Sequence, residues 1–192
     1  MNKHIIYLAA GNSRRFGSNK LLHIFHGKPL YQYGLDMVFK FCKKRQDCSL
    51  LVISQYSEIL QYARTKGIHT ADSPDSRKGM SYTVKRAVQA LGNIAEEDYI
   101  MFVVADQPYL TEKTLERLAD QAAPDVETIS AIYKGIPGNP TLFSARLIPE
   151  LMELQGDEGG RKVIRRYACI YVEVEDKKEL YDIDEKRQVS PD

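Results

Sequence analysis

The stretch IIYLAAGNSRRFGSNKLL, residues 5–22, decides the fold that we expect for this chain. Its first four residues are apolar, and two glycines, two arginines and a lysine follow within a dozen positions. An apolar run that ends at small residues and glycine predicts a buried strand that opens into a loop. We therefore expect a strand over residues 4–9, followed by a glycine-rich and basic loop.

Strands and helices alternate along the rest of the chain. The segment DYIMFVVADQP, residues 98–108, contains five consecutive apolar residues without alternation, which predicts a strand covered on both faces. Apolar residues spaced three and four apart predict helices, and two of these stop at glycine. Further strands are expected over 50–54, 68–71, 129–133 and 170–174, and helices over 30–44, 57–66, 81–91, 112–121, 145–154 and 160–167.

This order of elements predicts the fold class. Alternating strands and helices over at least the first 120 residues indicate βαβ units, hence an α/β fold with a mostly parallel central sheet. Thr111 is expected to cap the helix that follows it. The segment GIPGNP, residues 135–140, is rich in glycine and proline and predicts a turn. The length of 192 residues fits a single domain over 1–192.

The composition excludes several classes of protein. The net charge is +1, from 27 basic and 26 acidic side chains, whereas general electrostatic binders of nucleic acid carry a basic excess. No apolar run approaches the length of a membrane span, so no membrane is expected as a partner. The apolar N-terminal segment is interpreted as the first strand rather than as a secretory signal. Three cysteines without a C-x-x-C pair agree with reduced thiols and a cytoplasmic location.

The basic loop after the first strand has the features of a polyphosphate site. In open α/β sheets, ligands bind beyond the carboxyl ends of the strands, where this loop lies. Gly11 and Gly17 allow the backbone to approach a ligand, and consecutive amides can form an anion-binding nest. Arg15 and Lys20 add positive charge. The spacing matches neither the P-loop nor the dinucleotide fingerprint, which excludes the ATPase and nicotinamide signatures.

The loop resembles the nucleotidyltransferase pattern L-A-A-G-x-S-x-R-[MF]-G-x-x-K-L. Its fixed positions are Leu8, Ala9, Ala10, Gly11, Ser13, Arg15, Phe16, Gly17, Lys20 and Leu21. Five further motifs follow in order: GMS at 79–81, ADQP at 105–108, GNPTLF at 138–143, GDEGGR at 156–161 and YDID at 181–184. Together they make the chain similar to the molybdenum cofactor cytidylyltransferase family. Gly160 departs from this family, in which alanine is frequent at that position.

The resemblance implies a fold and an activity. The fold would be a Rossmann-like three-layer nucleotidyltransferase fold, with a nucleotide-binding half over about 1–110 and an acceptor-binding half over about 111–187. The enzyme would transfer CMP from CTP to molybdopterin cofactor, depend on Mg²⁺ and release pyrophosphate. A molybdoenzyme would be a further partner that receives the product. Ala10 is a cue for cytidine, because guanylyl relatives tend to carry glycine there.

The same resemblance, combined with the chemistry of the residues, predicts the site. Lys20 and Arg15 are expected to neutralise charge on the leaving pyrophosphate. Asp106 ends a buried strand, where an unpaired carboxylate is costly, and it is the best candidate for a magnesium ligand. Asp182 is the favoured second ligand, and Asp184, on the same face of an extended segment, is its alternative.

The remaining candidates bind substrates. The expected nucleotide-binding residues are Leu8, Ala9, Ala10, Gly11, Ser13, Arg15, Gly17, Lys20, Gly79 and Ser81. Ser81 is expected to cap the helix that it begins. The expected acceptor-binding residues are Asn139, Asp157 and Arg161.

Two other functions stay open at this point. The first is a guanylyl or other NTP transferase that acts on a different small phosphorylated acceptor. The second is a non-catalytic carrier that binds a nucleotide or a cofactor. Protection by the four triphosphates separates the first alternative, and the absence of triphosphate turnover identifies the second.

Overall fold

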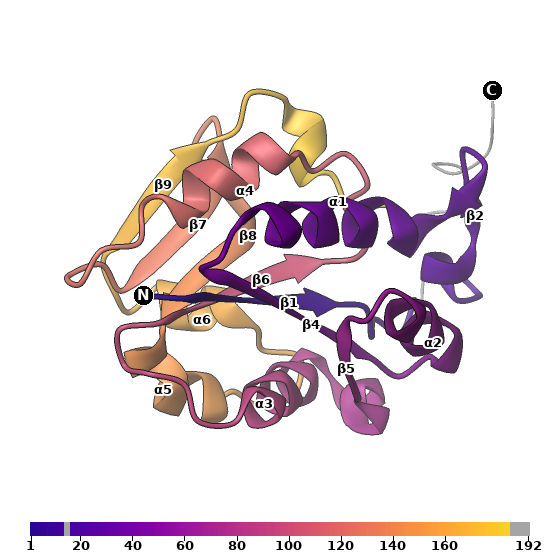
Figure 1. Cartoon of the computed structure of the whole chain (residues 1–192), viewed down its shortest axis with the longest axis horizontal. Coiled ribbons are helices and arrows are strands. Elements are labelled where there is room, and N and C mark those ends of the chain that lie inside the picture. The colour runs from indigo at the N-terminus through magenta and orange to yellow at the C-terminus, as the bar shows by residue number, and fades with distance from the viewer. Residues whose placement is uncertain (14–15, 185–192) are drawn as a thin grey trace.

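A seven-stranded sheet forms the centre of the computed structural model, which describes residues 1–13 and 16–184 (Figure 1). The order across the sheet is β5-β4-β1-β6-β8-β7-β9, so strands from before and after residue 110 share one sheet. The strands are β1 (Lys3–Leu8), β4 (Cys48–Ser54), β5 (His69–Asp72), β6 (Tyr99–Val104), β7 (Thr128–Tyr133), β8 (Ile136–Ser144) and β9 (Cys169–Glu173). A separate hairpin consists of β2 (Ile24–Phe25) and β3 (Lys28–Pro29).

The sheet is mostly parallel, as the sequence predicts. Strand β1 pairs in parallel with both β4 and β6, β4 pairs in parallel with β5, and β7 pairs in parallel with β9. Only β8 is antiparallel to its neighbours β6 and β7. Helices must connect the parallel strands across the faces of the sheet, which explains the continuous apolar runs in β1 and β6.

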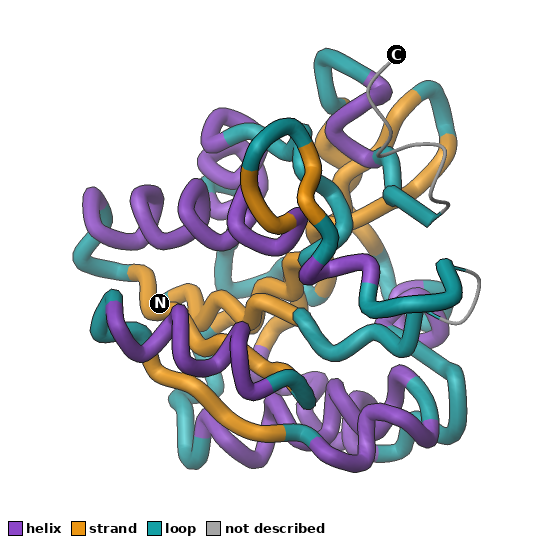
Figure 2. Tube along the Cα trace, turned by 90° about the vertical axis from the view of Figure 1, so that its right-hand side faces the viewer, coloured by secondary structure: helices purple, strands orange, loops and turns teal. Residues whose placement is uncertain are grey.

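Helices cover both faces and complete a three-layer α/β fold (Figure 2). The helices are α1 (Leu30–Lys44), α2 (Ser57–Thr65), α3 (Met80–Leu91), α4 (Glu112–Ala119), α5 (Ile148–Met152) and α6 (Gly160–Ile164). Helices α1, α2 and α4 pack on the face that carries Ile5 and Tyr7. Helices α3, α5 and α6 pack on the opposite face, which carries Ile6 and Leu8. None of the helices in the described part of the chain combines the length and the apolar composition that a bilayer span requires.

Short 3₁₀ helices complete the described elements. They are η1 (Lys20–Leu22), η2 (Pro74–Lys78), η3 (Ala145–Leu147) and η4 (Lys177–Leu180). Two of them bear on the site, because η1 begins at Lys20 and η4 leads into the YDID segment.

The prediction of a turn over residues 135–140 is wrong. Only Lys134 and Gly135 form the turn, both with positive φ, and the chain then continues as β8 from Ile136. Strand β6 pairs with β8 only from Thr141 onward, so the first half of β8 has a free edge. Prolines are tolerated on such an edge, because their missing N–H groups cost no ladder hydrogen bond.

Two predicted helices are shorter than expected. The helix over 145–154 is divided into η3 and α5, and α5 carries Pro149 in its first turn. Proline favours the first turn of a helix and opposes continuation of a preceding one, which accounts for the break. The helix over 160–167 ends at Ile164. Thr111 caps α4 as predicted, since its side chain accepts from the Thr114 amide.

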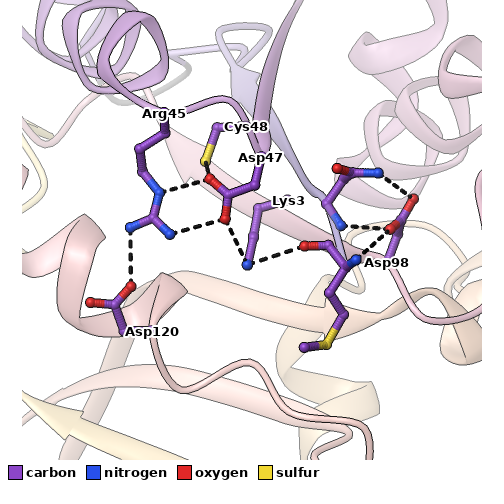
Figure 3. A network of polar contacts seen from close by, with 8 residues as sticks. Lys3, Arg45, Asp47, Cys48, Asp98 and Asp120 are labelled. Carbon is purple, nitrogen blue, oxygen red and sulfur yellow. Dashed lines mark hydrogen bonds and ion pairs between the residues drawn. The ribbon is translucent and has the colours of Figure 1, made fainter.

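A polar network lies at the end of the sheet where β1 and β4 begin (Figure 3). The Asp47 carboxylate accepts hydrogen bonds from the Arg45 guanidinium at 2.9 and 3.0 Å and from Lys3 Nζ at 2.8 Å. Arg45 also donates to Asp120, at the end of α4. The network therefore joins β1, the turn before β4 and helix α4. It lies at the opposite end of the strands from the loop that follows β1.

Candidate functional site

The loop after β1 lies where three parallel strands end together. Leu8 is in register with Ile53 on one side and with Val104 on the other. The Ala9 amide donates to Ile53 O at 2.8 Å, and the Ala105 amide donates to Leu8 O at 3.1 Å. The ends of β4 and β6 therefore flank the glycine-rich loop, as the rule for ligand sites in α/β sheets requires.

Three consecutive side chains at the end of β4 bind three consecutive carbonyls of this loop. Ser54 Oγ donates to Ala9 O at 2.7 Å, Gln55 Nε2 donates to Ala10 O at 2.6 Å, and Tyr56 Oη donates to Gly11 O at 2.7 Å. The sequence analysis missed these residues. Their only signal is the polar triplet SQY directly after the buried run LLVI.

The loop is also bound to its other neighbours. Asn12 accepts from Gln55 Nε2 at 3.1 Å and donates to the carbonyls of Ser76 and Arg77. Ser13 has a positive φ of 49°, and its hydroxyl accepts from the Lys20 amide at 3.1 Å. These contacts fix the first part of the loop between β4, η2 and η1.

Lys20 is the buried cation of the site. Its Nζ lies 2.7 Å from Asp106 Oδ2 and 2.8 Å from Asp184 Oδ1, and its side chain is 9% exposed. Burial opposes the charged ammonium, but the charges and hydrogen bonds of Asp106 and Asp184 outweigh it and raise the pKa of Lys20. The lysine is thus held in its charged form at the end of β6.

Asp182 lies beside this ion pair and bonds differently. Its Oδ1 accepts from Gln107 Nε2 at 2.8 Å, and the Ile183 amide donates to Asp106 O at 3.0 Å, which brings the YDID segment to the end of β6. Partial loss of water, together with the negative charge of Asp106, raises the pKa of Asp182 to about 6. The carboxylates of Asp106, Asp182 and Asp184 therefore lie near Lys20 at the end of β6.

This donor set fits a hard divalent cation. Asp106 and Asp182 each have one oxygen engaged by Lys20 or Gln107, and both are carboxylates, the ligands that magnesium prefers. Among residues 1–13 and 16–184, no group of three or more His, Cys, Asp or Glu side chains is arranged to hold a metal ion. An ion here would complete its coordination with water and phosphate oxygens.

A cleft extends from the loop along the ends of the strands. It has a volume of about 190 Å³, and its lining includes Ala10, Gly11, Lys20, Gly79, Asp106 and Asp157. Leu8 also lines it, while Ala9 is fully buried beneath it. Gly17 has a positive φ of 72° in the second part of the loop. The predicted Arg15 lies outside the described residues.

Gly79 and Ser81 lie at the beginning of α3. Gly79 has a φ of 142°, and a Cβ at this position would lie 2.3 Å from Gly156 O. The expectation that Ser81 caps the helix is wrong, because α3 already begins at Met80 and Gly79 occupies the cap position. Ser81 is 1% exposed, and its amide donates to Gly156 O at 3.1 Å. Both positions therefore join α3 to the GDEGGR loop.

The three predicted acceptor residues lie around one cavity. Asn139, Asp157 and Arg161 line a hollow that adjoins the first cleft, and Asp157 lines both. Arg161 donates to Pro137 O at 2.9 Å. Gly160 is close to the core here, since a Cβ would lie 2.7 Å from the Phe143 ring. This contact explains why the chain carries glycine rather than alanine beside Phe143.

Comparison with known proteins identifies relatives over nearly the whole chain. The family model described as MobA-like NTP transferase domain matches residues 5–170. The chain is 28% identical to the purine catabolism protein PucB of Bacillus subtilis (strain 168), over 93% of this chain and 90% of that protein. It is 23% identical to the molybdenum cofactor cytidylyltransferase of Escherichia coli (strain K12), over 93% and 89% respectively.

The fold is also found among solved structures. The crystal structure of Rv0371c from Mycobacterium tuberculosis H37Rv, determined in complex with manganese, superposes with a TM-score of 0.71. The two chains are 22% identical, and the match covers 91% of this chain and 88% of the other.

Proposed function

The chain belongs to the family of MobA-like NTP transferase domains, and from this premise we propose that it transfers CMP from CTP to molybdopterin cofactor and releases pyrophosphate. One observation carries the proposal. A buried lysine is held by hydrogen bonds to two carboxylates at the mouth of a cleft that begins at a glycine-rich loop. A cation, carboxylate ligands for a metal ion and the amides of a glycine-rich loop together suit a nucleoside triphosphate.

The triphosphate would lie against the loop after β1. Ser54, Gln55 and Tyr56 engage the loop carbonyls from the β4 side, which leaves amides of the loop for the ligand. Lys20, and Arg15 as predicted from the sequence, would neutralise charge on the leaving pyrophosphate. The nucleoside would extend along the cleft toward Gly79 and the first turn of α3.

We propose that Asp106 and Asp182 hold a divalent cation, with magnesium as the expected ion. Asp184 would then stay paired with Lys20, as it is in the structure. The Asp106 and Asp182 carboxylates lie close together at the end of β6, and this proximity supports a cation at this place. When bound, the ion would supply positive charge that offsets the charge of the phosphates.

The reaction needs no general base from the protein. The acceptor phosphate monoester is mostly ionised near neutral pH, since its second pKa is about 6. One of its oxygens attacks the α-phosphorus, a new P–O bond forms, and the bond to the bridging oxygen of the leaving pyrophosphate breaks. The protein contributes positioning and charge neutralisation, chiefly through Lys20.

The acceptor half of the site would be formed by Asn139, Asp157 and Arg161. Arg161 supplies positive charge for a phosphate, and the cavity that these residues line adjoins the nucleotide cleft. The product would pass to a molybdoenzyme. The choice of cytidine as the base in this proposal is based on Ala10, which lines the cleft.

A pyrophosphate-release assay tests this proposal. The protein is incubated with Mg²⁺ or Mn²⁺, each of the four triphosphates in turn and molybdopterin cofactor. We expect release with CTP, its loss in Asp106→Asn, and a rate one to three decades lower in Lys20→Met, which keeps the aliphatic stem. Lys113→Ala, an exposed lysine of α4, serves as the control.

The outcomes separate the alternatives. Release with GTP in place of CTP assigns a guanylyl transferase and refutes the proposed base. Absence of release with every triphosphate, while CTP still raises the melting temperature, refutes transfer to molybdopterin cofactor. A carrier is then identified only if other phosphorylated acceptors also give no release.

A further inference from the structure

One backbone corner lies between the loop after β1 and the GDEGGR loop. It is formed by Gly79, where η2 ends and α3 begins. On one side, Asn12 of the loop after β1 donates to Ser76 O at 3.4 Å. On the other side, the Ser81 amide donates to Gly156 O at 3.1 Å. The two loops are therefore connected through this corner, although they are far apart in the sequence.

Buried hydroxyl groups hold the corner together. Ser76 Oγ donates to Ser73 Oγ at 2.7 Å, and Thr83 Oγ1 donates to Ser76 Oγ at 2.7 Å. All three residues are buried, where the low local dielectric strengthens a hydrogen bond. These bonds fix η2, and with it the carbonyl to which Asn12 is bound, against the first turns of α3.

The missing side chain of Gly79 makes the contact with the GDEGGR loop possible. A Cβ at this position would lie 2.3 Å from Gly156 O, 2.5 Å from Gly156 C and 2.9 Å from Asp157 Oδ1. The first two atoms belong to the backbone, so they can move aside only if the loop itself moves. Gly79 also has a φ of 142°, which residues with a side chain rarely adopt. This close approach therefore fixes where the GDEGGR loop begins.

The loop that is seated here carries two of the predicted acceptor residues. Asp157 directly follows Gly156 and lines both the nucleotide cleft and the adjoining cavity, while Arg161 lines the cavity. A second contact lies further along the loop, since a Cβ at Gly159 would lie 3.3 Å from Met80 Cγ. The start of α3 therefore contacts the loop at two places and sets the position of Asp157 at the junction of the two cavities.

We infer that Gly79 is a positioning residue for the acceptor, because its bare backbone seats the GDEGGR loop and so places Asp157 and Arg161. This inference rests on the proposed function and deepens it, since it assigns what holds the acceptor loop at a fixed distance from the loop after β1. Transfer requires reacting atoms about 3–3.5 Å apart, so a displacement of about 1 Å between the loops is costly. Gly79 would act through Gly156 and Asp157, without a contact to the acceptor.

Hydrogen exchange, measured by mass spectrometry, tests the seating of the loop without any substrate. We expect the amides of residues 153–165 to exchange at least tenfold faster in Gly79→Ala than in the wild type. Gly92→Ala is the matched control, because Gly92 ends the same helix with a φ of 68° and its Cβ would meet nothing within 4 Å. It introduces backbone strain alone, and exchange over 153–165 should stay unchanged. If melting curves show that Gly79→Ala does not fold, Thr83→Val, which removes the hydrogen bond to Ser76, replaces it with the same expected direction.

The kinetics of pyrophosphate release test the consequence for the reaction. In Gly79→Ala we expect the KM for the acceptor to rise at least tenfold, and by a larger factor than the KM for CTP. Asp157→Ala should lower kcat/KM for the acceptor less in the Gly79→Ala background than in the wild type, because the displaced carboxylate has already lost its position. In the Gly92→Ala background, Asp157→Ala should have its full effect.

Three results would overturn the inference. The first is exchange over residues 153–165 that is unchanged in Gly79→Ala, or in Thr83→Val where that variant replaces it. The second is a KM for CTP that rises as much as the KM for the acceptor, or more. The third is additivity of Gly79→Ala and Asp157→Ala. A protein that consumes no triphosphate refutes the proposed transfer instead, and the exchange experiment then still decides whether Gly79 seats the loop.

Discussion

At the scale of single residues, the loop after β1 depends on side chains of the neighbouring strand end that need not touch a substrate. The hydroxyl of Tyr56 donates to Gly11 O from outside the cleft, next to the bonds that Ser54 and Gln55 make. Holding three carbonyls on one side restricts the orientation of the peptide units between them. The amides of the loop are thereby organised before the ligand arrives, which reduces the entropy cost of binding.

Removal of this hydroxyl should weaken nucleotide binding. In Tyr56→Phe we expect the KM for the triphosphate to rise by about 3- to 10-fold, the equivalent of one hydrogen bond of roughly 1 kcal/mol, with kcat nearly unchanged. Steady-state kinetics and a thermal melt are measured together. Tyr62→Phe, which removes a bond to Asp36 away from the loop, is the control. A lower melting temperature with an unchanged KM would show that Tyr56 has only a structural role.

Asp182 should destabilise the metal-free protein at neutral pH. Its folded pKa of about 6 exceeds the ordinary value of about 3.9, so the folded state retains the proton between these values. Stability is therefore lost as pH rises through this window, the reverse of a salt-bridged carboxylate. We expect Asp182→Asn to melt at a higher temperature than the wild type at pH 7.5 and at the same temperature near pH 4.

The control for this prediction is Asp184→Asn, which removes a partner of Lys20 and should give no gain at pH 7.5. Stabilisation that is equal at both pH values would assign the effect to something other than the Asp182 charge.

At the scale of elements, the segment that carries Asp182 is attached to α4 by one buried glutamate. Glu179 of η4 is 5% exposed, and its Oε2 accepts from the hydroxyls of Thr111 and Thr114 at 2.7 and 2.6 Å. The same oxygen accepts from the Thr111 amide at 3.2 Å. A carboxylate at the beginning of a helix also interacts favourably with the helix dipole. The position of Asp182 thus depends on α4, an element that lies far before it in the sequence.

Replacement of this glutamate should loosen the attachment. In Glu179→Ala, the two threonine hydroxyls lose their shared acceptor, and we expect the free energy of unfolding to fall by about 1–3 kcal/mol in urea titrations. Glu116→Ala, an exposed position on the same helix, should change stability little. A loss in Glu179→Ala no larger than in the control would contradict the attachment.

Strand β8 illustrates what sequence patterns miss at this scale. Its glycines and prolines, taken locally, predict a turn, and tertiary pairing decides otherwise. Half of the strand has no partner from β6, and the pattern does not reveal that free edge. The buried run of β6 and the capping role of Thr111 follow from local chemistry alone, and both predictions are confirmed.

At the scale of the whole molecule, the two ends of the parallel strands differ in their polar groups. The candidate site lies at the C-terminal ends of the strands, where Asp106, Asp182 and Asp184 lie near Lys20. The network of Lys3, Arg45 and Asp47 lies at the N-terminal ends of the strands (Figure 3). There the hydrogen bonds from Arg45, followed by those from Lys3, hold the pKa of Asp47 well below its usual range. We therefore expect the first end to serve binding and the other end to contribute to stability.

The stabilisation by the Asp47 network should be lost in acid. Because the folded pKa of Asp47 is depressed, its contribution is present above the unfolded value of about 3.9 and is lost as pH falls through the folded value. We expect Asp47→Asn to lower stability by about 1–2 kcal/mol at pH 7, with a difference that diminishes below pH 4. Glu175→Gln, which breaks an exposed pair with Lys113, should have no measurable effect. A constant difference from pH 7 to pH 3 would contradict the assigned cause.

The sequence by itself determined the alternation of elements, the parallel centre of the sheet and the loop after β1, because these follow from local composition and periodicity. It also singled out Lys20 and Asp106, since a lysine in a glycine-rich loop and a carboxylate at the end of a buried strand are local signals. Only the tertiary structure decided that Lys20 pairs with Asp106 and Asp184, which lie 86 and 164 positions away. The same holds for the SQY triplet behind the loop and for the cavity lined by Asn139, Asp157 and Arg161. Sheet order and register bring these distant segments together, and local patterns do not encode them.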